Sequence, residues 1–288
     1  MDQLAGRVAV ITGAGSGMGK AFAARFAAEG MKIVAADIEQ DALTTAVREL
    51  TAAGHEVTGV LTDVADAGAV RALADEAVAR FGAVHLLCNN AGVEGYLDGA
   101  IWEATSNDWA WTVDVNFWSV VHGIRAFVPL MLAHGEPAHI VNTASMTAVT
   151  SAGNMYGITK HAVLALSEVL HADLRARGAP IGVTALCPGI VATNLFRGSR
   201  NRPSRLRDGG APGSREGTEL RDRMHATLAQ GMPPAQVADK LVGAIRRDTL
   251  YLLTDHEWDE RIRRRHEAIL AGADGPAPAV PAGADGDE

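Results

Sequence analysis

Tyr156 and Lys160 stand four residues apart at the start of a strongly helical pattern. Side chains at this spacing share one face of a helix, so a phenol and an ammonium group would lie side by side. The ordinary pKa of a tyrosine, roughly 10, is too high for efficient proton transfer near neutral pH. An adjacent cation favours the phenolate and lowers this pKa. The pair could therefore act as an acid–base catalyst, although a lysine packed along an aromatic ring on a helix surface is the ordinary alternative.

A glycine-rich segment near the start of the chain could bind a pyrophosphate. The apolar residues 8–11 lead into Thr12-Gly-Ala-Gly-Ser-Gly-Met-Gly19, and a helical pattern follows at once. Glycines allow a tight turn and a close approach of the backbone to a phosphate. The start of a helix offers free N–H groups and the positive end of a dipole to the same phosphate.

Asp37 lies eighteen residues beyond Gly19, at the end of the next apolar segment. A carboxylate there can accept hydrogen bonds from an adenosine ribose and would repel a 2′-phosphate. Neither Ser16 nor Ile38 supplies a basic side chain that would reverse this preference. The sequence therefore favours NAD over NADP as cofactor, with helix capping as the alternative role of Asp37.

Short apolar segments alternate with longer helical patterns along the chain, which predicts βαβ units and a parallel sheet. The strands are nearly all apolar, as expected when helices cover both faces of a sheet. We therefore expect an α/β fold: a single Rossmann-type, doubly wound parallel sheet of about seven strands with helices on both faces. The predicted strands are residues 8–11, 32–36, 56–61, 84–88, 140–143, 183–186 and 251–253. The predicted helices include residues 17–29, 67–81, 106–133 and 155–177, a helix ending near 53 and another beginning near 231.

The chain has 288 residues, of which 48% are hydrophobic, and shows no break in composition before about residue 271. We expect one NAD-binding catalytic domain over residues 1–271. Residues 194–218 have little periodicity and several Gly, Pro and Arg residues, so this long loop is predicted to form a substrate lid. Residues 272–288 are acidic and rich in Ala, Pro and Gly, which predicts a disordered tail.

The bulk properties argue against several classes of partner. A net charge of −8 disfavours general affinity for nucleic acid or an anionic membrane. We expect no apolar run long enough to span a bilayer and no signal peptide, because the N-terminus lacks a basic region followed by an apolar stretch. Cys88 and Cys187 end predicted buried strands and are expected to be core residues, with no disulfide and no metal site. These features predict a cytoplasmic location.

Four motifs in order resemble those of the classical short-chain dehydrogenase/reductase family. They are Thr12-Gly13-x-x-x-Gly17-x-Gly19, Asn89-Asn90-Ala91-Gly92, Tyr156-x-x-x-Lys160 and Pro188-Gly189-x-Val191-x-Thr193. The resemblance covers about residues 5–255. It implies hydride transfer between NAD and a secondary alcohol or ketone, and a homo-oligomer that is a dimer or a tetramer.

The resemblance also implies a set of cofactor-binding residues. Asp63 and Val64 would hold the adenine, although Asp63 could instead be a turn or cap residue. Ile190 and Thr193 would contact the nicotinamide carboxamide. The full implied set is Gly13, Ser16, Gly17, Met18, Gly19, Asp37, Ile38, Asp63, Val64, Asn90, Ala91, Gly92, Tyr156, Lys160, Pro188, Gly189, Ile190 and Thr193.

Four residues would form the catalytic set by the same resemblance. Tyr156 would transfer the proton, and Lys160 would lower its pKa and bind the nicotinamide ribose. Ser145 would hydrogen-bond the substrate oxygen, although it could be only a turn residue. Asn116 would hold a helix backbone and a relay water, or it could be a buried polar residue that satisfies a backbone group. The stretch from Ser145 to Tyr156 is about two residues shorter than is common in the family, and Ser151 is too close to Tyr156 to replace Ser145.

The substrate end is less well defined by sequence. Residues 93–102, 146–155 and 195–218 should lie beyond the carboxyl ends of the strands. They supply a mainly apolar set, which predicts a roomy apolar pocket formed by Tyr96, Met146, Met155, Leu195 and Phe196. Residues 225–270 loosely resemble family members that act on bulky secondary alcohols and aryl ketones.

Charged residues in these segments leave alternatives open. Glu94 could recognise a polar substrate group or face solvent, and solvent is favoured. The lid arginines could bind an anionic substrate or remain solvated on a mobile loop, and the second is favoured. These arginines are Arg197, Arg200, Arg202, Arg205, Arg207 and Arg215.

Two other functions compete with the alcohol dehydrogenase. A sugar-nucleotide epimerase or dehydratase usually has a differently spaced glycine motif and a larger C-terminal substrate domain. A non-catalytic nucleotide-sensing or scaffold protein typically lacks the Tyr/Lys pair, which is intact here.

Overall fold

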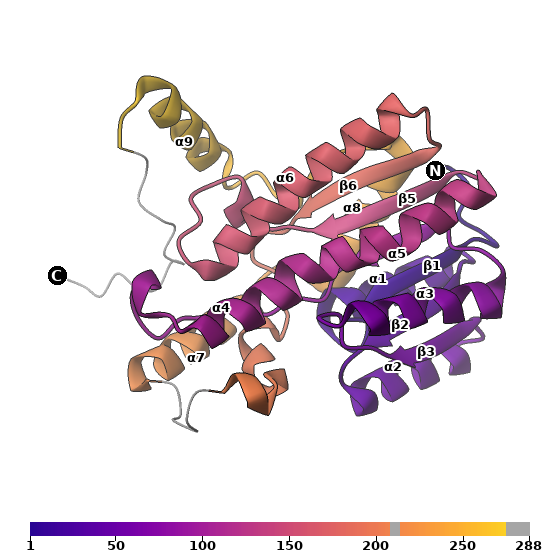
Figure 1. Cartoon of the computed structure of the whole chain (residues 1–288), viewed down its shortest axis with the longest axis horizontal. Helices are drawn as coiled ribbons and strands as arrows, with labels where there is room; N and C mark the ends of the chain where they lie inside the picture. Colours follow the sequence, from indigo (N-terminus) through magenta and orange to yellow (C-terminus); the bar gives the residue numbers. More distant parts are fainter. Residues whose placement is uncertain (208–213, 275–288) are drawn as a thin grey trace.

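The computed structural model describes residues 1–207 and 214–274. These residues form a seven-stranded sheet in which all neighbouring strands are parallel, in the order β3-β2-β1-β4-β5-β6-β7 (Figure 1). The strands are β1 (Val8–Thr12), β2 (Lys32–Asp37), β3 (Val57–Leu61), β4 (Leu86–Asn89), β5 (Ala138–Thr143), β6 (Ile181–Cys187) and β7 (Tyr251–Leu253). The predicted doubly wound parallel sheet is confirmed.

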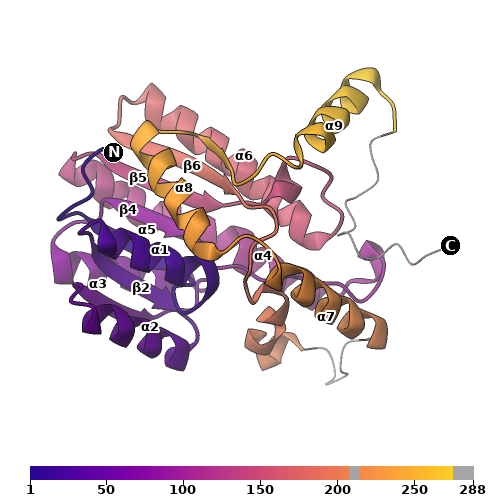
Figure 2. The ribbon, with the colours of Figure 1, turned by 180° about the vertical axis from the view of Figure 1, so that it is seen from behind.

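Helices cover both faces of the sheet (Figures 1 and 2). They are α1 (Gly17–Ala28), α2 (Gln40–Ala52), α3 (Ala67–Phe81), α4 (Ser106–Val113), α5 (Ser119–His134), α6 (Met155–Ala176), α7 (Arg215–Ala229), α8 (Pro234–Arg247) and α9 (Asp259–Ala271). Ala9 and Ile11 of β1 belong to the core under α1, α2 and α8, whereas Val8 and Val10 belong to the core under α3, α5 and α6. Because alternate side chains of a strand point to opposite faces, β1 must be apolar at every position.

The site follows from the position of β1 in the sheet. β1 pairs with β2 on one side and with β4 on the other. The chain therefore winds away from β1 in both directions, and the carboxyl ends of β1 and β4 border a crevice. Ligands of open α/β sheets bind in such a crevice.

The predicted helix over residues 106–133 is divided into three parts. α4 and α5 are joined by a π-helical turn, Asp114–Trp118. Such turns insert one residue into an α-helix and often occur at functional sites. Here the turn places Asn116 in the interior, with none of its surface exposed.

This combined helix also bears on the membrane prediction. Ser106–His134 has 29 residues and contains an 18-residue window with a mean hydropathy of 1.3, so among the described helices it could span a membrane by length and composition. The expectation that no such run exists was therefore wrong. One helix of this kind is weak support for a membrane location, because a core helix passes the same test. α5 packs against α3 and β4.

The lid prediction over residues 194–218 needs correction, because much of the segment is helical. It contains two 3-10 helices, Leu195–Asn201 and Ser204–Leu206, and α7 begins at Arg215. Residues 208–213 lie outside the described residues, as does most of the predicted tail at 272–288. α9 projects away from the sheet in both views and contains no buried residue (Figures 1 and 2).

Candidate active site

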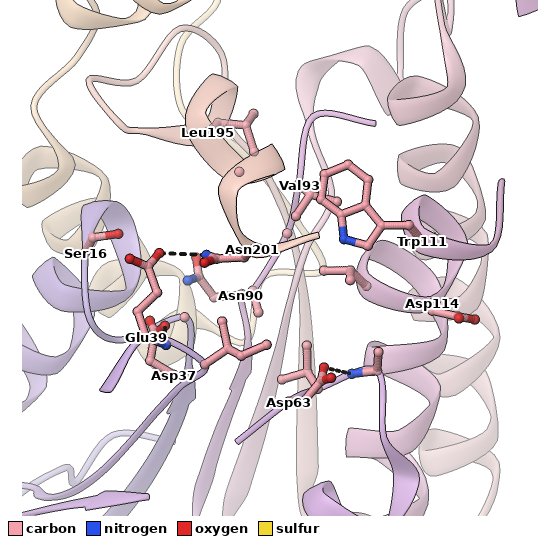
Figure 3. A pocket seen from close by; sticks show the side chains of 18 of the residues that line it. Ser16, Asp37, Glu39, Asp63, Asn90, Val93, Trp111, Asp114, Leu195 and Asn201 are labelled. Atoms are coloured by element: carbon pink, nitrogen blue, oxygen red, sulfur yellow. Dashed lines mark hydrogen bonds between the residues drawn. The ribbon is translucent and has the colours of Figure 1, made fainter. Parts of the chain in front are cut away.

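A cleft of about 1290 Å³, counting space open to solvent, lies beyond the carboxyl ends of the strands (Figure 3). Its wall combines the glycine turn, the loops after β2, β3 and β4, the π-helical turn, the start of α6 and the lid. Most of the predicted cofactor residues line this cleft: Gly13, Ser16, Gly17, Met18, Asp37, Ile38, Asp63, Val64, Asn90, Ala91, Gly92, Tyr156, Lys160 and Thr193.

The glycine turn leaves no room for side chains at its closest approach. A Cβ atom on Gly19 would lie 2.1 Å from the Gly13 carbonyl oxygen. Gly13 and Gly17 have φ angles of +67° and +51°, a backbone conformation that residues with a side chain rarely adopt. The turn therefore brings bare backbone to the N-terminus of α1, where an anion can bind.

Thr12 and Asn90 join the ends of β1 and β4. The Thr12 hydroxyl accepts hydrogen bonds from the backbone N–H groups of Asn90 at 2.9 Å and Ala91 at 3.1 Å. The Asn90 amide donates to the Thr12 carbonyl at 2.9 Å. Its other atom, Oδ1, has no hydrogen-bond partner within the described chain, although Asn90 lines the cleft. Thr12 belongs to the glycine motif, but the motif predicts no role for its side chain. In the structure, this side chain fixes the loop after β4.

Asp37 is held in place by two backbone groups. Its carboxylate accepts hydrogen bonds from Gly15 N–H at 2.8 Å and from Glu39 N–H at 2.9 Å. The N-cap of α2 is Glu39, so Asp37 is not the cap. The carboxylate is fixed at the cleft, where it can accept hydrogen bonds from the hydroxyls of a ribose.

Asn116 fastens the loop after β4 to the π-helical turn. Its Oδ1 accepts from Val93 N–H at 2.8 Å, and its Nδ2 donates to the Val93 carbonyl at 2.9 Å and to Thr159 Oγ1 at 3.2 Å. Asn116 was expected to bind a helix backbone. Instead, it both accepts from and donates to the backbone of Val93, in the loop after β4. Thr159 lies on α6 beside Lys160, so Asn116 also joins this loop to the helix of the Tyr/Lys pair.

Tyr156 and Lys160 occupy the first turns of α6, as predicted, and both line the cleft. The Lys160 Nζ atom lies 5.4 Å from the centre of the Tyr156 ring and donates a hydrogen bond to the Thr143 carbonyl at 2.7 Å. Burial raises the pKa of Tyr156 to about 12, and the nearby Ser145 hydroxyl acts in the opposite direction. Burial lowers the pKa of Lys160 to about 8. Lys160 is not among the groups that shift the pKa of Tyr156, so the expected lowering of this pKa by Lys160 is not found.

The other predicted catalytic residue, Ser145, lies two residues beyond the end of β5 and is the N-cap of the 3-10 helix Met146–Ala148. Its hydroxyl accepts a hydrogen bond from Thr147 N–H at 3.2 Å. Ser145 thus has the turn role that was considered as an alternative, and it also lies close to the Tyr156 phenol.

Four of the lid arginines form ion pairs within the chain and are not gathered around one anion site. Several pair with carboxylates of the same chain: Arg197 with Asp222, Arg200 with Glu39, Arg202 with Asp108 and Arg215 with Glu219. The guanidinium of Arg202 also lies 5.5 Å from the centre of the Trp111 ring. The expected solvated charges are found for Arg197 and Arg215, which are 50% and 92% exposed, but not for Arg202, which is 17% exposed.

Glu94 does not face solvent. It is only 1% exposed, and its Oε1 accepts a hydrogen bond from Ser199 N–H in the lid at 3.1 Å. Burial raises the pKa of this carboxyl. Arg221 of α7 lies 4.0 Å from Glu94 and forms a 2.7 Å ion pair with Asp98. Glu94 therefore fastens the lid to the loop after β4, and the expectation of a solvent-facing side chain was wrong.

The sequence matches the short chain dehydrogenase family over residues 7–204. The chain belongs to this family. It is 47% identical over 192 residues to the 1-deoxy-11-beta-hydroxypentalenate dehydrogenase of Streptomyces avermitilis, which covers 66% of this chain and 70% of that protein. It is 33% identical over 273 residues to the C alpha-dehydrogenase of a Sphingobium species, covering 94% of this chain and 87% of the relative.

Solved structures of this family agree with the fold. A short chain dehydrogenase/reductase from Burkholderia phymatum in complex with NAD superposes with a TM-score of 0.93. The two sequences are 43% identical, and the match covers 97% of this chain and all of that chain (100%). Membership of the family makes this chain an oxidoreductase with a nucleotide-binding cleft.

Some predicted residues of this short-chain dehydrogenase shape the site without lining the cleft. Gly19 packs against the turn, and Gly189 N–H donates to Thr254 at 2.9 Å. The others outside the cleft lining are Pro188, Ile190, Asn116, Ser145, Glu94, Tyr96, Met146, Met155 and Phe196. Of the predicted substrate residues, Leu195 lines the cleft (Figure 3).

Several residues of the cleft wall were not predicted from the sequence. Trp111, Asp114 and Val115 come from α4 and the π-helical turn. Helical periodicity does not predict that their side chains point into the cleft. Glu39 and Asn201 meet across the cleft wall from distant parts of the chain. Only the position of Glu39, two residues after Asp37, could have drawn attention to it.

Proposed function

We propose that the protein is an NAD-dependent dehydrogenase that interconverts a bulky, mainly apolar secondary alcohol and its ketone. One observation carries the proposal: Tyr156 and Lys160 line the same cleft as the glycine turn and Asp37. A proton-transfer group and a site suited to a dinucleotide thus share one cavity.

The residues present fit NAD. The bare backbone at Gly13 and Gly17 would hold the pyrophosphate, and the fixed carboxylate of Asp37 would bind the adenosine ribose. Lys160 would bind the nicotinamide ribose. Bound NAD supplies the hydride acceptor, while the protein supplies orientation and electrostatics.

Tyr156 would take the proton of the substrate hydroxyl, and Ser145 would donate a hydrogen bond to the substrate oxygen as negative charge develops there. Burial raises the pKa of Tyr156 to about 12. A working base therefore needs additional positive charge nearby, which oxidised nicotinamide carries. We propose that the phenol becomes an effective base only in the cofactor complex.

The substrate class is supported by the cleft and by the relatives. Val93, Trp111, Leu195 and Leu206 give the cleft an apolar wall. The relatives named above are dehydrogenases of 1-deoxy-11-beta-hydroxypentalenate and, in the second case, a C alpha-dehydrogenase. This apolar part of the wall suits a large hydrophobic alcohol.

We further propose that residues 1–271 act as one catalytic domain, in the cytoplasm, as a homodimer or homotetramer. Exposed apolar side chains on the outer sides of the π-helical turn, α5 and α6 support self-association: Trp118, Leu132, Ile158 and Val169. Large apolar side chains that remain exposed on a folded chain are candidates for an interface.

The test is NADH formation from NAD and a panel of secondary alcohols that increase in size. Tyr156→Phe should lower kcat by about 10² to 10⁴-fold while NADH still binds. Tyr251→Phe is the matched control, because this exposed tyrosine hydrogen-bonds Glu168 outside the cleft. A wild-type protein that binds NADH but turns over no alcohol or ketone would instead support a nucleotide-sensing or scaffold role.

A further inference from the structure

Three consecutive lid residues bind carboxylates on two separate elements, one at the start of α2 and one on α4. Arg200 and Asn201 contact Glu39 at the start of α2, and Arg202 contacts Asp108 on α4. We call residues 200–202 the strap. In Figure 3, Asn201 and Glu39 meet on the side of Asp37, and Trp111, beneath Arg202, lies on the other side.

The contacts on the Asp37 side are polar and partly exposed. Asn201 Nδ2 donates to Glu39 Oε1 at 2.7 Å, and Arg200 Nε donates to Glu39 Oε2 at 3.3 Å. The Arg200 guanidinium also pairs with Glu39 Oε1. Burial acts to raise the pKa of Glu39, but the hydrogen bonds from Asn201 and Arg200 outweigh it and keep this pKa below its ordinary value. Glu39 is therefore the charged acceptor for both strap residues.

The contact on α4 is better shielded. The Arg202 and Asp108 side chains are 17% and 11% exposed, against 42% and 30% for Arg200 and Glu39. Arg202 donates to Asp108 Oδ1 at 2.6 Å and lies over Trp111. Exposed ion pairs are weak and shielded ones are held more firmly, so the strap should detach first at Glu39.

The Glu39 end of this bridge belongs to the cleft that holds Asp37, and at the other end Trp111, beneath Arg202, lines the same cleft. Glu39, Arg200 and Asn201 line it together with Asp37 and Ile38. A ligand whose ribose is bound by Asp37 would therefore lie beneath the strap. The lid residues Arg200 and Asn201 therefore lie at the end of the cleft that would hold the adenosine.

We infer that Glu39 and the strap form a gate over the adenosine half of a bound dinucleotide, and that the gate must open at Glu39 for the dinucleotide to leave. The inference rests on the proposed binding of NAD. It assigns Glu39 as a positioning residue: it acts through Arg200 and Asn201, and its function is to slow release of the cofactor.

The experiment measures NADH dissociation by stopped-flow fluorescence, with excess NAD as the displacing ligand. Glu39→Ala should release NADH about five- to tenfold faster than wild type, as expected for loss of a weak ion pair and a hydrogen bond. Glu39→Gln keeps one acceptor oxygen for Asn201, so its rate of NADH release should lie between those of wild type and Glu39→Ala. Glu29→Ala is the matched control, because Glu29 pairs with Arg246 at 2.6 Å where α1 and α8 end, and neither residue lines the cleft.

The charge-swapped variant Glu39→Arg with Arg200→Glu adds a rescue test, because it should recover part of the slow release. Hydrogen exchange of backbone amides 195–207 should show protection by NADH in wild type and less protection in Glu39→Ala. Equal release rates for wild type and Glu39→Ala, with NADH bound by both, would overturn the gate alone. A wild-type protein that binds no NADH would overturn the proposed function as well.

Discussion

Lys160 should destabilise the unliganded protein, so its replacement by methionine should raise the free energy of unfolding. The ammonium is 2% exposed, and the hydrogen bond found for it goes to the Thr143 carbonyl. Burial lowers its pKa from 10.5 to about 8. This difference corresponds to about 3 kcal/mol at neutral pH. Lys160→Met removes that cost but leaves the Thr143 carbonyl without its donor, at about 1 kcal/mol, so we expect a net gain of about 2 kcal/mol.

The sign of the pH dependence follows from the lowered pKa of Lys160. Between about pH 8 and 10.5 the unfolded chain binds more protons than the folded protein, so the stability of wild type rises with pH in this range. The excess free energy of unfolding of Lys160→Met over wild type should be fully present near pH 7 and largely lost at about pH 10. Urea unfolding of the NAD-free protein at these two pH values measures it.

Lys240→Met is the control for this prediction, because Lys240 is exposed on α8 and should change stability by no more than about 0.5 kcal/mol at either pH. If Lys160→Met were less stable than wild type near neutral pH, the interpretation of Lys160 as a desolvated cation would be wrong. An equal effect at both pH values would refute the proposed titration in the same way.

Two further predictions concern the cofactor cleft. Gly19→Ala should abolish NADH binding, measured by fluorescence titration, because its Cβ would lie 2.1 Å from the Gly13 carbonyl oxygen; retained affinity would show that the turn can relax. Asp37→Ser should raise kcat/KM with NADP relative to NAD by about tenfold or more, because a like charge facing the 2′-phosphate is removed; an unchanged ratio would place the specificity elsewhere.

The sheet and the glycine turn could be predicted because their signals are local. The apolar run and the glycines around Gly13 are contiguous, and their geometry depends on backbone freedom and alternation. The spacing of Tyr156 and Lys160 likewise fixes their shared face. The predicted and observed bounds of these elements differ by a few residues at most, and residues 67–81 match α3 at both ends.

The lid could not be predicted because its order depends on distant partners. Glu39 and Asp108 lie more than ninety residues before the arginines that they bind. Without those partners, the charged residues near Arg200 have the composition of a solvated loop. Glu94 was misjudged for the same reason, since its burial depends on Ser199 from the lid.

The π-helical turn was missed for a different reason. One inserted residue leaves the apolar pattern of residues 106–133 helical on either side, so periodicity does not reveal it. The insertion nevertheless sets the direction of Asn116, whose amide binds both backbone groups of Val93. The motif identified Asn116 as a functional residue, but only the fold shows what it holds.

Three successive residues after β4 connect parts of the site that the sequence treats separately. A Cβ on Gly92 would lie 3.5 Å from Lys160 Nζ, Val93 is bound on both backbone groups by Asn116, and Glu94 accepts from the lid at Ser199. The lid is therefore attached two residues from the point where the loop meets the catalytic lysine. A short rigid loop transmits small displacements, whereas a flexible one would absorb them. The two-way hydrogen bond of Asn116 supplies that rigidity, so the geometry at Lys160 and the position of the lid depend on the same buried amide.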